Sequence, residues 1–169
     1  MVVQIVNGYQ IERGAYLHGA DLTRAYLHSA FLPSANLNKA KMMGAVLHGA
    51  NLFEAKMIGA DLTDARLDNS NLEGANLSGA KMLRVNLTDA RMMGADLTGT
   101  ILTRACLYGA KMIGADLSGA DLRDAILTSA NLSSANLSGA NLEGSNLFSA
   151  YWDDADLSGA IMPDGSTHD

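Results

Sequence analysis

The chain has 169 residues, a formal net charge of −6 and an isoelectric point near 5.0. Hydrophobic residues make up 48% of it, but aromatic residues only 5%. An acidic chain with few aromatic rings is poorly suited to bind a phosphate backbone or to stack bases, so we predict no nucleic-acid partner. Most of the apolar share comes from 26 Ala and 24 Leu. Such strong bias indicates an internal repeat.

The first segment, residues 1–14, lies outside the repeat and contains apolar residues that do not fit its register: Val2, Val3, Ile5, Val6, Tyr9 and Ile11. We predict a strand-like cap here, with an interface role as the alternative. It lacks the basic and apolar regions of a secretory signal, and no run in the chain approaches the roughly 18 apolar residues of a membrane helix. The single cysteine, Cys106, excludes an intrachain disulfide. We therefore expect a cytoplasmic protein without membrane contact.

Residues 15–164 divide into 30 consecutive units of five residues without an insertion. The first place of the unit is Ala in 26 of them, and the third place is Leu in 23. Met and one tryptophan, Trp152, fill the remaining third places. Glycine occupies the fifth place in 14 units. The regularity over 150 residues shows that this segment is one repeating structure.

A period of five excludes one amphipathic helix, because successive leucines would be about 140° apart around the helix axis. In extended backbone, the first and third places point to the same side and the second place to the other. The fourth and fifth places carry turn-forming residues. The repeat therefore predicts a solenoid with Ala and Leu inside, whose coils stack at the strand spacing of about 4.8 Å.

Asn or Asp fills the second place in 15 of the 30 units, as in ADLTR, ANLEG, ANLSG and ADLSG. In this register the sequence resembles the pentapeptide-repeat family. The resemblance implies an all-β fold, a right-handed quadrilateral β-helix with four units per coil, about 7.5 coils and no loop insertions. We expect the Asn and Asp ladders to provide solubility and hydrogen bonds between stacked coils.

At the carboxyl end, residues 165–169 form a tail after the last unit. Phe148, Tyr151 and Trp152 cluster just before it. These aromatic side chains are expected either to cap the open end of the solenoid or to form a homodimer contact.

Five units share a basic second place, an inward Met and an apolar fourth place. Two of these units lie on the wall through Leu32, which places Phe53, Met93 and Ile113 in one column beside Arg91 and Lys111. One interpretation is that the basic side chains shield the apolar ones from water. The other is that these five residues form a surface for a protein partner.

His28, His48 and Asp68 are expected in one outward column. Two solvated surface histidines are the simpler interpretation, with binding of a divalent transition metal as the alternative. We expect Cys106 to be a surface thiol rather than a nucleophile. The repeat offers no cleft that could hold a nucleophile, a base and an orienting group. No catalytic residue, cofactor site or metal site is therefore predicted.

We conclude from the sequence that the chain is a non-catalytic solenoid that serves as a scaffold for a protein partner, which the sequence does not name. The alternative is a protein that imitates duplex DNA and binds DNA gyrase, as some members of the resembling family are thought to do. No wall of the solenoid sums to a charge beyond −2, and opposite charges alternate along one of them. The alternating charges are therefore expected to stabilise the stacking of neighbouring coils, and they do not form the continuous negative surface that mimicry of DNA requires.

Overall fold

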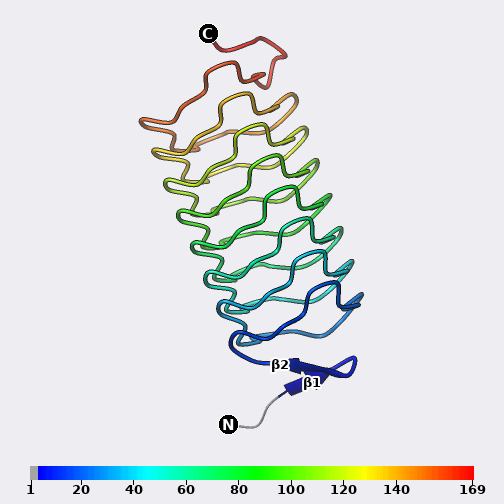
Figure 1. Cartoon of the computed structure of the whole chain (residues 1–169). Coiled ribbons are helices and arrows are strands. Elements are labelled where there is room, and N and C mark those ends of the chain that lie inside the picture. The colour runs from blue at the N-terminus through cyan, green and yellow to red at the C-terminus, as the bar shows by residue number, and fades with distance from the viewer. Residues whose placement is uncertain (1–3) are drawn as a thin grey trace.

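The computed structural model describes residues 4–169, so Met1, Val2 and Val3 of the predicted cap lie outside the described residues. The chain begins with an antiparallel hairpin of β1 (Gln4–Val6) and β2 (Tyr9–Ile11). Asn7 and Gly8 connect the strands with φ values of 52° and 82°. Two consecutive positive φ values are typical of the tight type I′ hairpin turn. The hairpin lies at one end of a stack of coils that continues to the carboxyl end (Figure 1).

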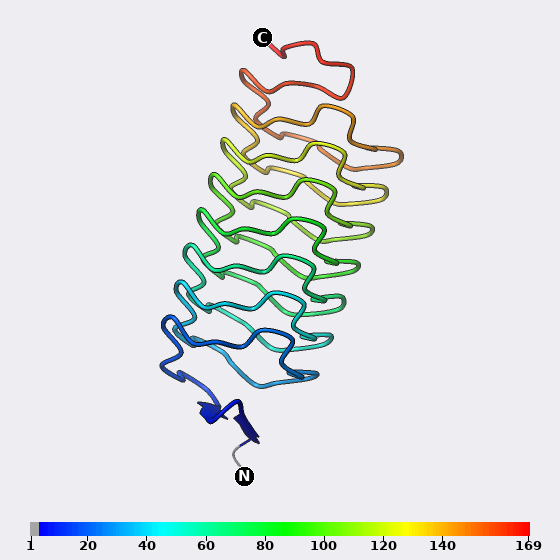
Figure 2. The ribbon, with the colours of Figure 1, turned by 90° about the vertical axis from the view of Figure 1, so that its right-hand side faces the viewer.

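The coils are held in register by single-residue parallel bridges between second places 20 residues apart. They run without a gap from the Tyr16–Asn36 pair to the Asn141–Ile161 pair. Four units of five residues therefore complete one coil, and each unit contributes one side. The stacking of successive coils is visible in two perpendicular views (Figures 1 and 2). The predicted quadrilateral β-helix is confirmed.

Each unit repeats one scheme of backbone hydrogen bonds, which the unit beginning at Ala75 illustrates. The Asn76 N–H donates to a carbonyl of the preceding coil, over 2.9 Å, and the Leu77 N–H donates to the following coil, over 2.7 Å. The Gly79 N–H also donates to the following coil, and the Ala80 N–H closes the turn on the Leu77 carbonyl, over 2.8 Å. Only the N–H of the fourth place, here Ser78, has no backbone acceptor.

The bend between sides depends on the fifth place. Every fifth place from Gly19 to Gly159 has a positive φ, between 53° and 69°. Glycine adopts this conformation without strain, which explains its frequency there, whereas other residues pay about 1 kcal/mol or more. At Gly109 an added Cβ would also meet the Asp89 carboxylate of the preceding coil, while nothing lies near Gly99. The turn residues thus set both the direction of the chain and part of its stability.

The interior consists of the first and third places, as predicted. From Leu22 to Leu142 the third-place side chains are at most 1% exposed. Three non-alanine first places, Ser70, Val85 and Thr100, are equally buried. The Thr100 hydroxyl donates to the Leu97 carbonyl over 2.7 Å, whereas the buried Ser70 hydroxyl has no hydrogen-bond partner. Within residues 4–169, the structure contains no helix long and apolar enough to cross a membrane.

The hairpin lies against the first coil and takes the place of a preceding coil. Its Tyr9 hydroxyl accepts a hydrogen bond from the Asp21 N–H, over 3.3 Å, and the Asn7 amide donates to the Asp21 carbonyl, over 3.2 Å. The Gln4 amide donates to the Tyr26 carbonyl over 3.4 Å. Ile11 is buried in the core of the solenoid. Side chains of the hairpin therefore satisfy backbone groups that a coil would otherwise satisfy.

Candidate interaction surfaces

The second-place Asn and Asp side chains bind within their own unit. In all 15 such units the side-chain Oδ1 accepts a hydrogen bond from the N–H of the fourth place, over 2.9–3.2 Å. This is an Asx turn, and it satisfies the one backbone donor that the coil leaves free. Asn38, which occupies a fourth place, instead reaches another coil, where its Oδ1 accepts from the Ile58 N–H over 2.9 Å. The expected hydrogen bonds between stacked Asn and Asp ladders are thus replaced by local ones.

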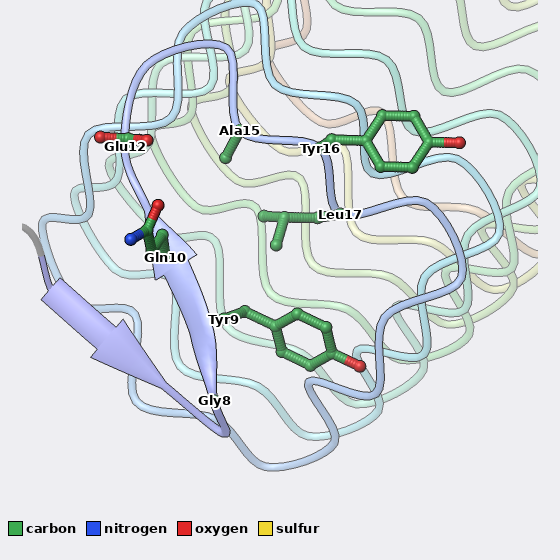
Figure 3. Close-up of a pocket in the computed structure, with 7 residues that line it drawn as sticks. All are labelled: Gly8, Tyr9, Gln10, Glu12, Ala15, Tyr16 and Leu17. Carbon is green, nitrogen blue, oxygen red and sulfur yellow. The ribbon is translucent and has the colours of Figure 1, made fainter.

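Shallow hollows lie on the surface of the described residues, and two of them are candidate sites. One, of about 300 Å³, lies between the hairpin and the first side and is lined in part by Tyr9, Glu12 and Tyr16. Figure 3 shows the Tyr16 ring directed away from Glu12, so these polar groups do not converge on one point. The other, of about 380 Å³, lies over Thr23, Met43 and Asp64. Neither hollow combines a nucleophile with a hydrogen-bonded base.

The apolar and basic residues of the predicted strip lie on one wall. The Phe53 and Ile113 side chains are 39% and 41% exposed, and Met93 is half-buried. Arg91 and Lys111 are paired across neighbouring coils by a backbone bridge. The strip is not continuous, because Glu73 occupies the fourth place between Phe53 and Met93.

Glu73 changes the charge of this strip. The Arg91 Nε donates to Glu73 Oε1 over 2.7 Å, so the charge of Arg91 is balanced within the wall. Lys111 is exposed and has no ion-pair partner among residues 4–169. We refer to Phe53, Arg91, Met93, Lys111 and Ile113 as the apolar-basic strip. Its character is therefore mainly apolar, with one free cation.

The carboxyl end is covered at one corner only. After the last unit the chain turns back, and Ile161 pairs antiparallel with Thr167. The Met162 N–H donates to the Ser166 carbonyl and the Gly159 N–H to the His168 carbonyl, over 2.7 and 2.8 Å. The tail thus pairs with the backbone at Gly159 and Met162, while the Leu157 N–H has no backbone partner within residues 4–169.

The two preceding sides of the last coil remain open. The N–H groups of Leu147 and Trp152 and the carbonyl of Ala150 have no backbone partner within residues 4–169. The side chains beside them are exposed: Phe148 by 75%, Tyr151 by 60% and Trp152 by 39%. The predicted aromatic cluster therefore lies beside unpaired backbone groups of the last coil. We refer to residues 145–155 as the open edge.

The structure brings together the three side chains of the predicted His28, His48 and Asp68 column. The imidazole rings of His28 and His48 stack with centroids 5.2 Å apart and planes inclined by 4°. His48 Nδ1 lies 2.5 Å from Asp68 Oδ2. Asp68 is 8% exposed, and its Oδ1 has no hydrogen-bond partner, although Arg66 Nε lies 3.5 Å away. No group of three or more His, Cys, Asp or Glu within residues 4–169 is arranged to hold a metal.

The charge of Asp68 follows from these contacts. Burial raises the pKa of the Asp68 carboxyl, but hydrogen bonds from His48 and Arg66 lower it more, so that its pKa lies below the ordinary value. Asp68 is therefore a carboxylate at neutral pH. Cys106 lies elsewhere on the same wall, and its Sγ is 3.3 Å from the Thr88 hydroxyl, which is no base that could activate a thiol.

Several acidic groups of the wall through Leu22 are neutralised by ion pairs. Arg84 binds Asp64 through two hydrogen bonds of 2.7 Å, and Arg123 binds Asp121 over 2.7 Å. These hydrogen bonds lower the pKa of both carboxyls. Paired charges of this kind produce no extended negative field like that of a DNA duplex.

Comparison with known proteins agrees with the architecture. The family model for pentapeptide repeats matches overlapping segments from residue 13 to residue 164: 13–49, 34–69, 45–83, 80–119, 105–144 and 125–164. A search of curated proteins finds no match. The chain is similar to solved structures of the same kind of protein.

A pentapeptide repeat protein of the thylakoid lumen of Arabidopsis thaliana is 33% identical over 59% of this chain and 69% of its own, with a TM-score of 0.54. HetL, a pentapeptide repeat protein involved in heterocyst differentiation regulation in the cyanobacterium Nostoc, is 32% identical over 92% of each chain, with a TM-score of 0.37. QnrB1, a plasmid-mediated fluoroquinolone resistance protein, is 18% identical over 88% of this chain and 81% of its own, with a TM-score of 0.43.

Proposed function

The chain belongs to the pentapeptide-repeat family, whose fold is a right-handed β-helix, and on this premise we propose that it is a non-catalytic scaffold that binds other proteins. The flat walls and the absence of converging catalytic groups around the two hollows of the described residues support this proposal. Its single cysteine and acidic composition fit a cytoplasmic protein.

The observation that carries the proposal is the open edge. Unpaired backbone N–H and C=O groups beside exposed aromatic side chains form a surface to which another β-structure can add. The occupant we propose is a second copy of this chain. The amino-terminal end is covered by the hairpin, so the open edge of one copy meets the open edge of the other, and the pair is a symmetric homodimer.

The apolar-basic strip is proposed as the surface for a different protein partner. It lies on a wall that remains accessible when two copies meet at their carboxyl ends. Phe53 and Ile113 offer half-exposed apolar side chains, and Lys111 offers a free cation for an acidic group of the partner. A scaffold of this kind holds a partner at a fixed distance from the dimer axis, because the coils between the two surfaces form one hydrogen-bonded stack.

Sedimentation equilibrium tests the homodimer. We expect the wild-type chain to sediment as a dimer, and the double variant Phe148→Ser and Trp152→Ser to sediment as a monomer at the same concentration. The matched control is Tyr16→Ser with Phe31→Ser, since these aromatic residues are at least as exposed as Phe148 and Trp152 but lie on the first coil. A monomeric wild-type chain, or a dimer that the double variant leaves intact, would contradict the proposal.

Crosslinking followed by capture from the native host tests the scaffold. We expect a protein that is lost when Phe53, Met93 and Ile113 are replaced by Ser and retained by the Phe148→Ser and Trp152→Ser variant. If the captured protein were a gyrase subunit, the alternative of DNA mimicry would replace the scaffold. Retention of the same protein by the strip variant would exclude the strip as its binding surface.

A further inference from the structure

We propose that His28 and His48 form a surface site for one divalent transition metal ion, with Asp68 as a positioning residue for His48. The three side chains lie on successive coils of one wall, away from the open edge and the apolar-basic strip. The site is therefore independent of the proposed scaffold function.

The contact between His48 and Asp68 prepares His48 as a ligand. Because Nδ1 lies 2.5 Å from the Asp68 carboxylate, Nδ1 carries the proton and Nε2 keeps its lone pair. Metal-binding histidines commonly donate their other ring N–H to a carboxylate in this way, which fixes the ring and raises the basicity of the ligating nitrogen. Asp68 itself is held in place by burial and by Arg66.

The stacking of the two rings places a second imidazole beside His48. The ring centroids are 5.2 Å apart and the planes are inclined by only 4°, so the nitrogen lone pairs, which lie in the ring planes, do not converge on one point in the stacked arrangement. A metal–nitrogen bond is about 2.0–2.1 Å long, so two nitrogens on one ion lie at most about 4.2 Å apart. A shared ion therefore requires the His28 ring to rotate out of the stack, and its side chain can do so because it is exposed and forms no hydrogen bond within residues 4–169.

The chemistry of the donors selects the metal. Imidazole nitrogen suits Cu²⁺, Ni²⁺ and Zn²⁺, whereas Mg²⁺ and Ca²⁺ prefer oxygen ligands. Two protein ligands leave coordination positions for water, so the site is open at the surface. Cu²⁺ has the highest affinity for such nitrogen sites and provides a spectroscopic signal from its ligands.

Titration of the full chain with Cu²⁺, followed by calorimetry and electron paramagnetic resonance, tests the proposal. We expect one ion bound by two imidazole nitrogens. His28→Gln and His48→Gln should each lower the affinity by about tenfold or more and leave one nitrogen in the spectrum. The control variants His18→Gln and His168→Gln should change neither.

Asp68→Asn separates positioning from ligation. It should weaken binding by roughly 10- to 100-fold while the spectrum still shows two nitrogens. Thermal unfolding of each variant verifies that the fold is retained. Wild-type binding through a single nitrogen, or an affinity unchanged in both His28→Gln and His48→Gln, would overturn the proposal.

Discussion

The Asx turns allow a direct test of why Asn and Asp occupy half of the second places. Asn76 Oδ1 accepts hydrogen bonds from both the N–H and the hydroxyl of Ser78, over 3.0 and 2.8 Å. Replacing Asn76 with Ala removes the only acceptor of the half-buried Ser78 N–H. Loss of a partner for such a group costs about 1 kcal/mol of unfolding free energy, the same order as loss of a helix N-cap. For a chain of this size that corresponds to a decrease in Tm of about 2–4 °C.

Urea unfolding followed by circular dichroism measures this loss as a shift in midpoint at constant slope. Lys56 is the matched control, since it occupies the same column one coil earlier and has no side-chain acceptor. The Ile58 N–H of that unit uses Asn38 instead, over 2.9 Å. Lys56→Ala should therefore be neutral, while Asn38→Ala should cost as much as Asn76→Ala. Equal stability of Asn76→Ala and the wild type, or an equal loss in Lys56→Ala, would refute the reasoning.

Three further predictions concern the turns, the core and the ion pairs. Gly99→Ala should lower the unfolding free energy by about 1 kcal/mol, because alanine is strained at the positive φ of this position. Gly109→Ala should lower it by more, because the Asp89 carboxylate must also move. Equal urea midpoints for the two variants and the wild type would contradict this prediction. Ser70→Ala should raise the unfolding free energy by about 1 kcal/mol, measured in the same way, because it removes a buried hydroxyl without a partner. The hydrogen bond from Arg123 lowers the pKa of Asp121 in the folded state. The stabilisation from this ion pair is therefore fully present above the unfolded-state pKa of Asp, about 4, and is lost as the pH falls through the lower folded-state pKa. The difference in Tm between the wild type and Arg123→Gln should accordingly vanish in acid.

The inward positions were predictable because they are set by a period rather than by individual contacts. Spacings of two and three residues between Ala and Leu require an extended step and then a bend, whichever residues fill the other places. Even the irregular first places Ser70 and Thr100 are buried as the register requires. The position of the bend could be predicted from the Gly, Ser and Asp residues that fill many fourth and fifth places. The positive φ of fifth-place residues such as Arg24 and Lys39 could not be predicted from their residue type.

The role of the outward Asn and Asp side chains was not predictable from the period. A ladder of identical side chains suggests contacts along the ladder, and the sequence does not show which backbone donor a coil leaves free. Two other side-chain contacts could not be predicted from the period either. One is the hydrogen bond between Arg91 and Glu73 in the apolar-basic strip, and the other is the contact between His48 and Asp68, which depends on the orientation of the imidazole ring. These features follow from torsion angles of single side chains, on which the repeat places no constraint.

The free fourth-place N–H also explains other choices along the rod. Pro33 and Pro163, the only prolines of the chain, both occupy fourth places, where the missing N–H removes no backbone hydrogen bond. Conversely, a unit with neither Asn nor Asp at its second place and without proline at its fourth lacks the stabilisation of an Asx turn, and among these units the Ile58 N–H finds a side-chain acceptor in Asn38 of another coil. The units of His28 and His48 belong to this class, as do those of Met93 and Ile113. In the apolar-basic strip the second places are Arg91 and Lys111, so there the chain replaces two stabilising Asn or Asp residues by basic side chains that form part of the proposed binding surface.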